Sequence, residues 1–179
     1  MPACRRWFAV RTVRFKSRLT DGTLTLERYR QRDLLRLHQC FGSEVFLSAN
    51  RRPQPPPSHV PAFWLWLHRA FQWFYTLAAG SGDGRRVVGF IAFYDLVDSH
   101  GVTLAMAIFD PADRRRGYGR RALSLLLDDL ERRCVVDAVR VSVALENRAA
   151  EAFFRRLGFV PRTVDSDRQE LCRRFRNSR

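Results

Sequence analysis

The sequence predicts a single α/β domain in which one mixed, mostly antiparallel central sheet is flanked by helices. Its 179 residues fit one ordinary domain. Apolar residues make up 46% and charged residues 28% of the chain, which is the composition of a globular protein. Segments with the two-residue period of strands alternate with segments of helical period. The expected order is strand, two helices, three strands, helix, strand, helix and one or two closing strands.

The first part of this prediction is a strand followed by two helices. Residues 23–29 (TLTLERY) alternate between polar and apolar side chains, as strands do. Asp33 is expected to cap a helix whose inner face contains Leu34, Leu37, Cys40 and Phe41. Residues 42–61 contain five prolines and predict a loop. Ser58, near the end of that loop, is expected to cap a short helix that runs through Leu67.

Three strands are expected next. Residues 72–79 and 87–94 are rich in aromatic and β-branched residues, and the glycine-rich turn at 80–84 joins them into a hairpin. A second turn at 98–101 leads into a strand over 102–109, which Asp110-Pro111 ends.

The remaining elements are two helices separated by a strand, and then a closing pair of strands. Residues 118–133 place apolar side chains on one helical face, and residues 139–145 predict a strand that contains β-branched residues. Asn147 begins the last helix and Gly158 stands where its C-terminal cap belongs. The closing strands are expected at 159–164 and 168–175.

The charge of the chain is strongly basic. Lysine and arginine number 32 against 18 acidic residues, a net charge of +14, and Lys16 is the one lysine. Residues 1–20 contain no acid, so we expect a basic N-terminal extension there and the domain itself at 21–179. The charge is either a solvated arginine-rich surface or an attraction to nucleic acid, acidic membranes or a phosphorylated ligand.

The spacing of charged residues and cysteines argues against several classes of protein. No run of 18 residues is free of charge, so no membrane span is expected. The four cysteines are far apart and have no spacing suited to zinc, so we expect reduced thiols in a cytoplasmic protein and no metal site. No apolar stretch follows the basic N-terminus, which argues against a secretory signal.

The stretch most informative about chemistry is 110–127 (DPADRRRGYGRRALSLLL), where a strand ends and two glycines stand at the start of a helix. Unpaired backbone N–H groups and the helix dipole make such a turn an anion site. Five arginines crowd this end and the acids Asp128, Asp129 and Glu131 lie toward the other, an arrangement that opposes the dipole unless an anion binds. The pattern is neither a P-loop nor a dinucleotide fingerprint.

Two motifs resemble a known family. Arg114-x-x-Gly117-x-Gly119 matches the Q/R-x-x-G-x-G/A acetyl-CoA signature of the GNAT superfamily of N-acetyltransferases. The segment at 147–159, with Asn147, Ala150 and the pair Phe153-Phe154 before Leu157-Gly158-Phe159, is similar to a second segment of that superfamily. The likeness spans about residues 22–175, and residues 24–49 resemble the branch with ribosomal-protein N-terminal acetyltransferases.

The resemblance implies acetyl-CoA as cosubstrate and assigns residues to it. Backbone groups of Ala107, Ile108 and Phe109 would pair with the pantetheine arm. Amides of the stretch from Arg114 to Gly119 would hold the pyrophosphate, Arg120 or Arg121 would reach another phosphate, and Asn147 would touch the pantetheine or the acceptor side or serve as a helix cap. The implied cofactor-binding set is Ala107, Ile108, Phe109, Arg114, Arg115, Arg116, Gly117, Tyr118, Gly119, Arg120 and Asn147.

The catalytic residues cannot be carried over from the resemblance. Phe154 stands where many relatives have a tyrosine that protonates the departing thiolate, and Leu104 and Ser142 stand at two common base positions. The candidates for a general base are Asp95, Asp98, His100 and Glu146, each with a turn or surface role as its alternative.

The aromatic set Phe63, Trp64, Trp66, Trp73, Phe74 and Tyr75 is either an acceptor pocket or core packing on the sheet. The resemblance implies an N-acetyltransferase that works by direct attack of a primary amine in a ternary complex. Its acceptor is a small molecule or a protein N-terminus, and the protein is a monomer or a homodimer. The alternative function is a non-catalytic module that binds coenzyme A or RNA on the same fold.

Overall fold

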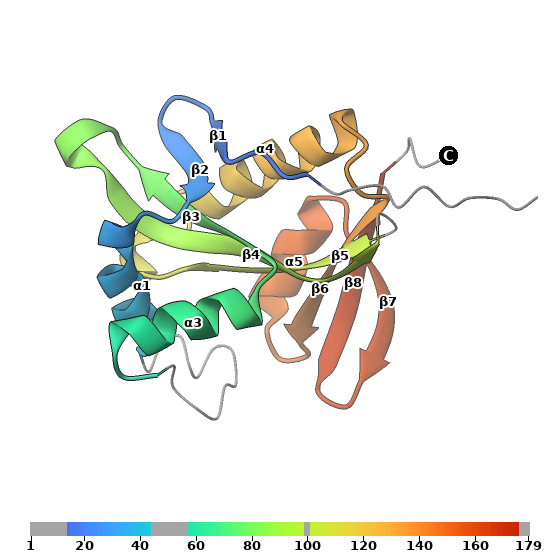
Figure 1. Ribbon diagram of the computed structural model, residues 1–179. Helices are drawn as coiled ribbons and strands as arrows, with labels where there is room; N and C mark the ends of the chain where they lie inside the picture. The colour runs from blue at the N-terminus through green and yellow to red at the C-terminus, as the bar shows by residue number, and fades with distance from the viewer. Residues whose placement is uncertain (1–13, 44–56, 99–100, 176–179) are drawn as a thin grey trace, which may run out of the picture.

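A computed structural model describes residues 14–43, 57–98 and 101–175. Its centre is a sheet of eight strands in the order β1-β2-β3-β4-β5-β6-β8-β7 (Figure 1). All neighbouring strands are antiparallel except β5 and β6, which are parallel. The predicted fold class, a mixed and mostly antiparallel sheet flanked by helices, is therefore confirmed.

The elements follow the predicted order closely. The strands are β1 (Arg18–Thr20), β2 (Leu24–Arg28), β3 (Trp73–Ala79), β4 (Arg86–Asp98), β5 (Gly101–Ile108), β6 (Ala138–Ala144), β7 (Val160–Asp165) and β8 (Arg168–Arg174). The α-helices are α1 (Leu34–Phe41), α3 (Val60–Ala70), α4 (Tyr118–Arg132) and α5 (Arg148–Arg156), and the short 3-10 turns are η1 (Gln31–Asp33), η2 (Gly82–Gly84) and η3 (Pro111–Asp113).

Each face of the sheet buries its own core. On one face, α4 and α5 pack against a cluster that includes Leu123, Leu127 and Phe159. On the other face, α1 and α3 enclose a second cluster centred on Phe41 and Phe63 (Figure 1). The buried face of α1 consists of the four predicted residues, Leu34, Leu37, Cys40 and Phe41.

Neither predicted helix cap makes the expected side-chain bond to its helix. Asp33 precedes α1 but makes no capping bond to it. Its carboxylate instead accepts the backbone N–H of Arg30 at 3.0 Å and pairs with Arg85 at 2.8 and 2.9 Å. The residue before α3 is His59 rather than Ser58, and its side chain makes no capping bond either. The Asp33 carboxylate is thus shared between the 3-10 turn that precedes α1 and Arg85, which lies 52 residues away.

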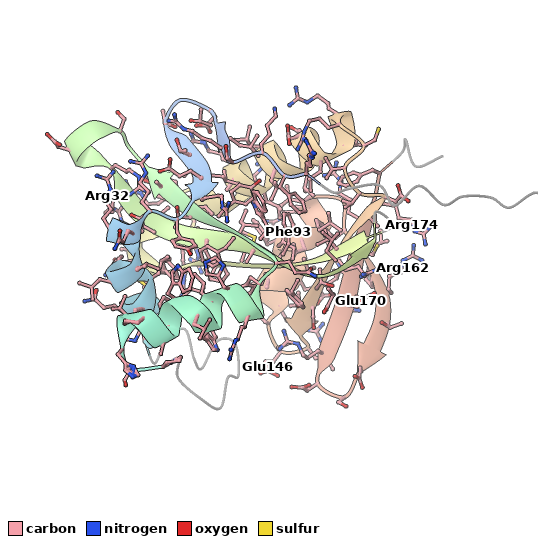
Figure 2. The ribbon with its side chains drawn as sticks, viewed as in Figure 1. Arg32, Phe93, Glu146, Arg162, Glu170 and Arg174 are labelled. Atoms are coloured by element: carbon pink, nitrogen blue, oxygen red, sulfur yellow. The ribbon has the colours of Figure 1, made fainter. Side chains whose placement is uncertain are left out.

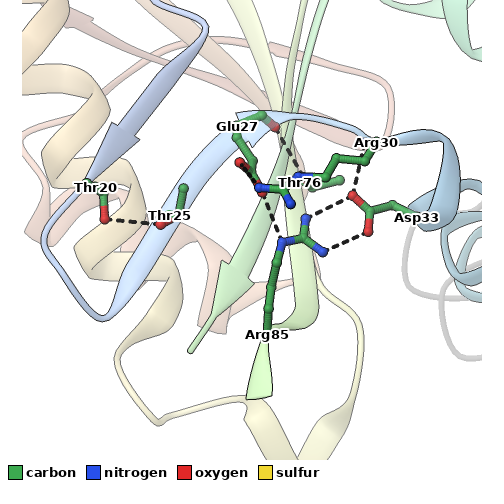
Figure 3. A network of polar contacts seen from close by, with 7 residues as sticks. All are labelled: Thr20, Thr25, Glu27, Arg30, Asp33, Thr76 and Arg85. Carbon is green, nitrogen blue, oxygen red and sulfur yellow. Dashed lines mark hydrogen bonds and ion pairs between the residues drawn. The ribbon is translucent and has the colours of Figure 1, made fainter. Parts of the chain in front are cut away.

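The Arg85 guanidinium is the centre of a polar network that ties three segments together (Figure 3). It pairs with Asp33 and with Glu27 of β2, at 2.9 Å, and both carboxylates are buried. Burial raises the pKa of Asp33 and Glu27, but the arginine hydrogen bonds outweigh it and leave both pKa values below their ordinary range. The network therefore fixes the hairpin of β3 and β4 against β2 and the start of α1.

The end of the expected basic extension is part of the fold: Arg18–Thr20 form the edge strand β1, and the residues just before them contact the core. Phe15 stacks on Phe93 with ring centroids 4.7 Å apart, and the Lys16 ammonium lies 2.9 Å from the buried carboxylate of Asp129. Tyr75 donates a hydrogen bond to the Lys16 carbonyl at 2.6 Å. Residues 1–13 lie outside the described part of the chain. Within that part, no helix combines the length and apolar character that a bilayer crossing needs.

Candidate active site

The parallel strands β5 and β6 pair only at their beginnings. Val102 pairs with Val139 and Thr103 with Arg140, and no further pair joins the two strands among the described residues. The other edge of β5 pairs with β4 as far as Ile108. The edge of β5 from Leu104 to Ile108 therefore has no strand partner on the β6 side, and its backbone groups are available to an extended ligand.

Strand geometry determines which backbone groups of β5 face this open edge. The Phe109 N–H donates to the Val88 carbonyl of β4 at 3.0 Å. Because alternate residues of a strand direct their backbone groups to opposite edges, those of Ile108 and Met106 face away from β4. The Ile108 carbonyl accepts a bond from Arg114 Nε at 3.4 Å. Of the three predicted residues, Ile108 thus lies on the open edge, and Met106 is one that sequence reasoning missed.

The loop after β5 leads directly into the start of α4. Arg115 and Gly117 both have positive φ, 61° and 83°, and Gly117 is the N-cap of α4. The first intrahelical bond runs from the Arg121 N–H to the Gly117 carbonyl, at 3.0 Å. The N–H groups of Tyr118, Gly119 and Arg120 thus have no intrahelical acceptor, and they stand at the positive end of the helix dipole.

The two glycines of the motif serve different purposes. A Cβ at Gly117 would meet nothing within 4 Å, so glycine is needed there for the left-handed backbone. A Cβ at Gly119 would lie 3.4 Å from the Met106 Cε, 3.7 Å from the Phe153 ring and 3.8 Å from Ile108 Cγ1. Gly119 therefore brings the helix N-terminus close to both α5 and the open edge of β5.

The arginines around this helix end fall into two groups. Arg86 pairs with both oxygens of Asp113, a carboxylate only 3% exposed, and this pairing lowers the pKa of Asp113. Arg116 lies 3.6 Å from Asp113, and Arg121 is bound to Asp21 at 2.6 Å. Three further arginines are exposed and have no carboxylate partner in the described part of the chain: Arg114, Arg115 and Arg120. Arg121, committed to Asp21, is the weaker of the two predicted phosphate contacts.

The second motif begins α5, beside the end of β6. The Asn147 side chain accepts a hydrogen bond from the Ala150 N–H at 3.1 Å and so caps the helix. Phe154 is 7% exposed and packs on Phe153 and Phe159, with ring centroids 5.1 and 5.4 Å away. The position of the family's tyrosine is therefore part of the core here.

Two of the candidate bases, Asp95 and Glu146, have side chains in the described part of the chain, and both are exposed. Asp95 is exposed and has a φ of 53° in the irregular part of β4, beyond the closed end where β5 and β6 pair. Glu146 is exposed in the turn between β6 and α5 (Figure 2). His100 and the side chain of Asp98 lie outside the described residues.

The aromatic set does not form one group, because the sheet divides it. Phe63, Trp66 and Phe74 belong to the α1 and α3 face, whereas Trp73 and Tyr75 lie on the α4 face. Trp64 is 44% exposed on α3. Most of the set is therefore core packing. In the parts of the chain that the structure describes, no three acidic, histidine or cysteine side chains are grouped as a metal site would need.

The chain is similar to known proteins both in sequence, through a family model, and in fold, through solved structures. The family model described as "Acetyltransferase (GNAT) family" matches residues 43–159. A probable GNAT acetyltransferase from Chromobacterium violaceum has a TM-score of 0.73 at 19% identity, over 97% of this chain and 93% of that one. No curated protein matches the sequence significantly.

Two further solved structures were determined with a cofactor. A putative acetyltransferase from Salmonella typhimurium, solved with acetyl-CoA, has a TM-score of 0.65 at 18% identity, over 87% of this chain and 95% of that one. A ribosomal alpha-N-protein acetyltransferase in complex with coenzyme A has a TM-score of 0.65 at 14% identity, over 88% and 98%. The family match covers more than half of the chain, and the chain is therefore an acetyltransferase of the GNAT family.

Proposed function

We propose that this protein binds acetyl-CoA along the open edge of β5 and transfers the acetyl group to a primary amine by direct attack in a ternary complex. The observation that carries the proposal is the juxtaposition of that edge with the N-terminus of α4, which Gly119 brings against Met106 and Ile108. An extended arm and a pyrophosphate need these two features side by side. The Salmonella relative solved with acetyl-CoA supports the choice of cofactor.

Each part of the cofactor has a matching group in the chain. The pantetheine arm pairs with the backbone of Met106 and Ile108 as an added strand. The pyrophosphate accepts hydrogen bonds from the N–H groups of 115–120, where the helix dipole favours negative charge. The exposed guanidinium groups of Arg114 and Arg120 neutralise the remaining phosphate charge.

The transfer forms a C–N bond to the acetyl carbon and breaks its C–S bond. A primary ammonium loses two protons in all, of which one ends on the coenzyme A thiol and one in solvent. A lysine-like amine must spend about 4.6 kcal/mol on its first deprotonation at neutral pH, whereas an α-amine spends about 1 kcal/mol. With no carboxylate on the open edge of β5 and a phenylalanine at position 154, the chain suits an amine that loses its proton readily.

The test is release of the coenzyme A thiol from acetyl-CoA in the presence of a panel of primary amines. We expect amine-dependent release, and binding of acetyl-CoA by calorimetry that Gly119→Val abolishes and Arg156→Gln, on the exposed side of α5, leaves intact. Binding without release for any amine would support the alternative, a non-catalytic coenzyme A module. Absence of binding would refute the proposal.

A further inference from the structure

The strands β5 and β6 separate beside the proposed acetyl site. Their last pair is Thr103 with Arg140, so Ser142 of β6 lies beyond the point where the two strands part. In the register that joins β6 to β8, the Leu145 N–H donates to the Asp167 carbonyl at 2.9 Å. Since alternate residues of a strand direct their backbone groups to opposite edges, the Ser142 carbonyl faces away from β8 and toward the open edge of β5.

Arg168 of β8 reaches across β6 to that carbonyl. It lies directly opposite Ala144, over whose single methyl group a long side chain can pass. The Arg168 Nε donates to the Ser142 hydroxyl at 2.7 Å, and its Nη2 donates to the Ser142 carbonyl at 2.9 Å. Because that carbonyl faces the open edge of β5, the guanidinium is held at the edge of β6 that borders the proposed acetyl site.

The guanidinium lies on the sheet face opposite α4. Val141 and Val143 of β6 enter the core beneath α4, so Ser142, between them, lies on the other face. The core that α1 and α3 enclose on that other face is built with β3, β4 and β5, and Figure 1 shows both helices away from β7 and β8. Among the described helices, none therefore covers the face on which Arg168 contacts Ser142.

The proposed cofactor approaches the same place from the α4 face. Gly119 brings the phosphate site against Met106 and Ile108, whose side chains pack on the core of that face. The arm follows the open edge of β5 from Ile108 toward the point where β6 joins it. The thioester thus lies where the two strands meet, and Arg168 stands beside it on the face that an acceptor can reach.

The charge of Arg168 is not neutralised by a carboxylate of the described residues. Its hydrogen bonds go to the neutral hydroxyl and carbonyl of Ser142. Asp165 lies directly opposite Arg168 on β7, and Glu170 lies two residues along β8, yet neither forms an ion pair with it. A guanidinium has five N–H donors, so those not bonded to Ser142 can bind an anion.

We propose that Arg168 binds an anionic group of the acceptor, a carboxylate or a phosphate that lies a few bonds from the primary amine. This inference rests on the proposed function, because it names the acceptor class of the same site. The separation is short because the guanidinium is held at the strand edge that borders the thioester. As the amine attacks the acetyl carbon and the C–S bond breaks, one amine proton ends on the thiol and one in solvent, while the anion stays on Arg168.

The experiment compares two pairs of acceptors with acetyl-CoA as donor: O-phosphoethanolamine with ethanolamine, and β-alanine with its amide. The measured quantity is the ratio of kcat/KM for the anionic member to that for its neutral partner. For at least one pair, we expect Arg168→Gln to lower this ratio tenfold or more, the value of a hydrogen bond to a charged group. Comparing variant with wild type cancels the different amine pKa values, and the pair with the larger fall distinguishes phosphate from carboxylate.

The matched control is Arg174→Gln, because Arg174 lies on the same face of β8 at its far end, opposite Ala138. It should leave both ratios unchanged. Ser142→Ala removes the hydroxyl that holds the Arg168 Nε but keeps the charge, so it should lower the ratio less than Arg168→Gln does. All these variants should bind acetyl-CoA as the wild type does, by calorimetry.

Three results would overturn this inference alone. They are unchanged ratios in Arg168→Gln, a wild type that acetylates neutral amines but no anionic one, and a raised Kd for acetyl-CoA in Arg168→Gln, which would place the guanidinium on the cofactor. A wild type that fails to bind acetyl-CoA, or that acetylates no amine, would overturn the proposed function and the inference with it.

Discussion

Substitutions at Gly119 should affect the stability of the fold and the binding of acetyl-CoA in opposite directions. The Cβ of Gly119→Ala would make ordinary contacts at 3.4 to 3.8 Å with Met106, Phe153 and Ile108, so no backbone needs to move. Each such contact contributes about 0.1–0.2 kcal/mol, and alanine is up to about 1 kcal/mol better than glycine in a helix. We expect Gly119→Ala to raise the free energy of unfolding by about 1 kcal/mol, which raises Tm by roughly 2–4 °C.

The same substitution should weaken the binding of acetyl-CoA. The phosphates must approach the N–H groups at 118–120 closely, beside the open edge of β5, and the new methyl group enters that space. We expect a measurable loss of affinity in Gly119→Ala and at least a tenfold rise in Kd in Gly119→Val, measured by calorimetry. Gly84→Val is the matched control, since its Cβ meets nothing within 4 Å and its φ is not positive. A folded Gly119→Val with wild-type affinity would refute the placement of the cofactor.

Three other predictions test the surroundings of the site. Asp113→Asn should cost about 1–3 kcal/mol in denaturant unfolding because it weakens the bonds to Arg86, whereas exposed Asp128→Asn should cost little; equal effects would contradict the role of the buried pair. Burial raises the pKa of Asp21, but hydrogen bonds from the Leu24 N–H and Arg121 outweigh burial and hold that pKa at about 2. Because the pKa is lower in the folded than in the unfolded chain, the ionised carboxylate stabilises the fold at pH values above the unfolded pKa, and this stabilisation is lost as the pH falls. The Tm difference between wild type and Asp21→Asn should therefore shrink as pH falls from about 4 to 2, and a difference constant with pH would contradict this. Phe154→Tyr should fold and keep its kcat or raise it, and a large loss of activity in a folded variant would show that Phe154 does more than pack.

The sequence alone predicted the elements in which apolar residues recur on one buried face. The inner face of α1 and the bounds of α4 follow from helical spacing, and the hairpin of β3 and β4 follows from its glycine-rich turn. Local capping was the weaker guide: Asp33 satisfies Arg85, 52 residues away, and a partner at that distance leaves no mark in the neighbouring sequence.

The motif of the candidate site was predictable from the sequence, but which alternate residues of its strands face the site was not. The glycines and arginines at 114–120 are visible as a pattern. Whether Ala107 or Ile108 faces the open edge depends on the register of β5 with β4, and which residues of β6 and β8 lie opposite one another depends on the pairing of those two strands. Both registers are set by contacts between segments far apart in the chain, so a pattern in one strand cannot reveal them.

Amide hydrogen exchange, followed residue by residue with and without acetyl-CoA, would locate the cofactor on the chain directly. We expect new protection at Met106 or Ile108 on the open edge of β5 and at several amides of 115–120. Phe109, already bonded to Val88, should change little. Protection confined to other segments, or none at saturating acetyl-CoA, would contradict the placement of the cofactor at β5 and α4.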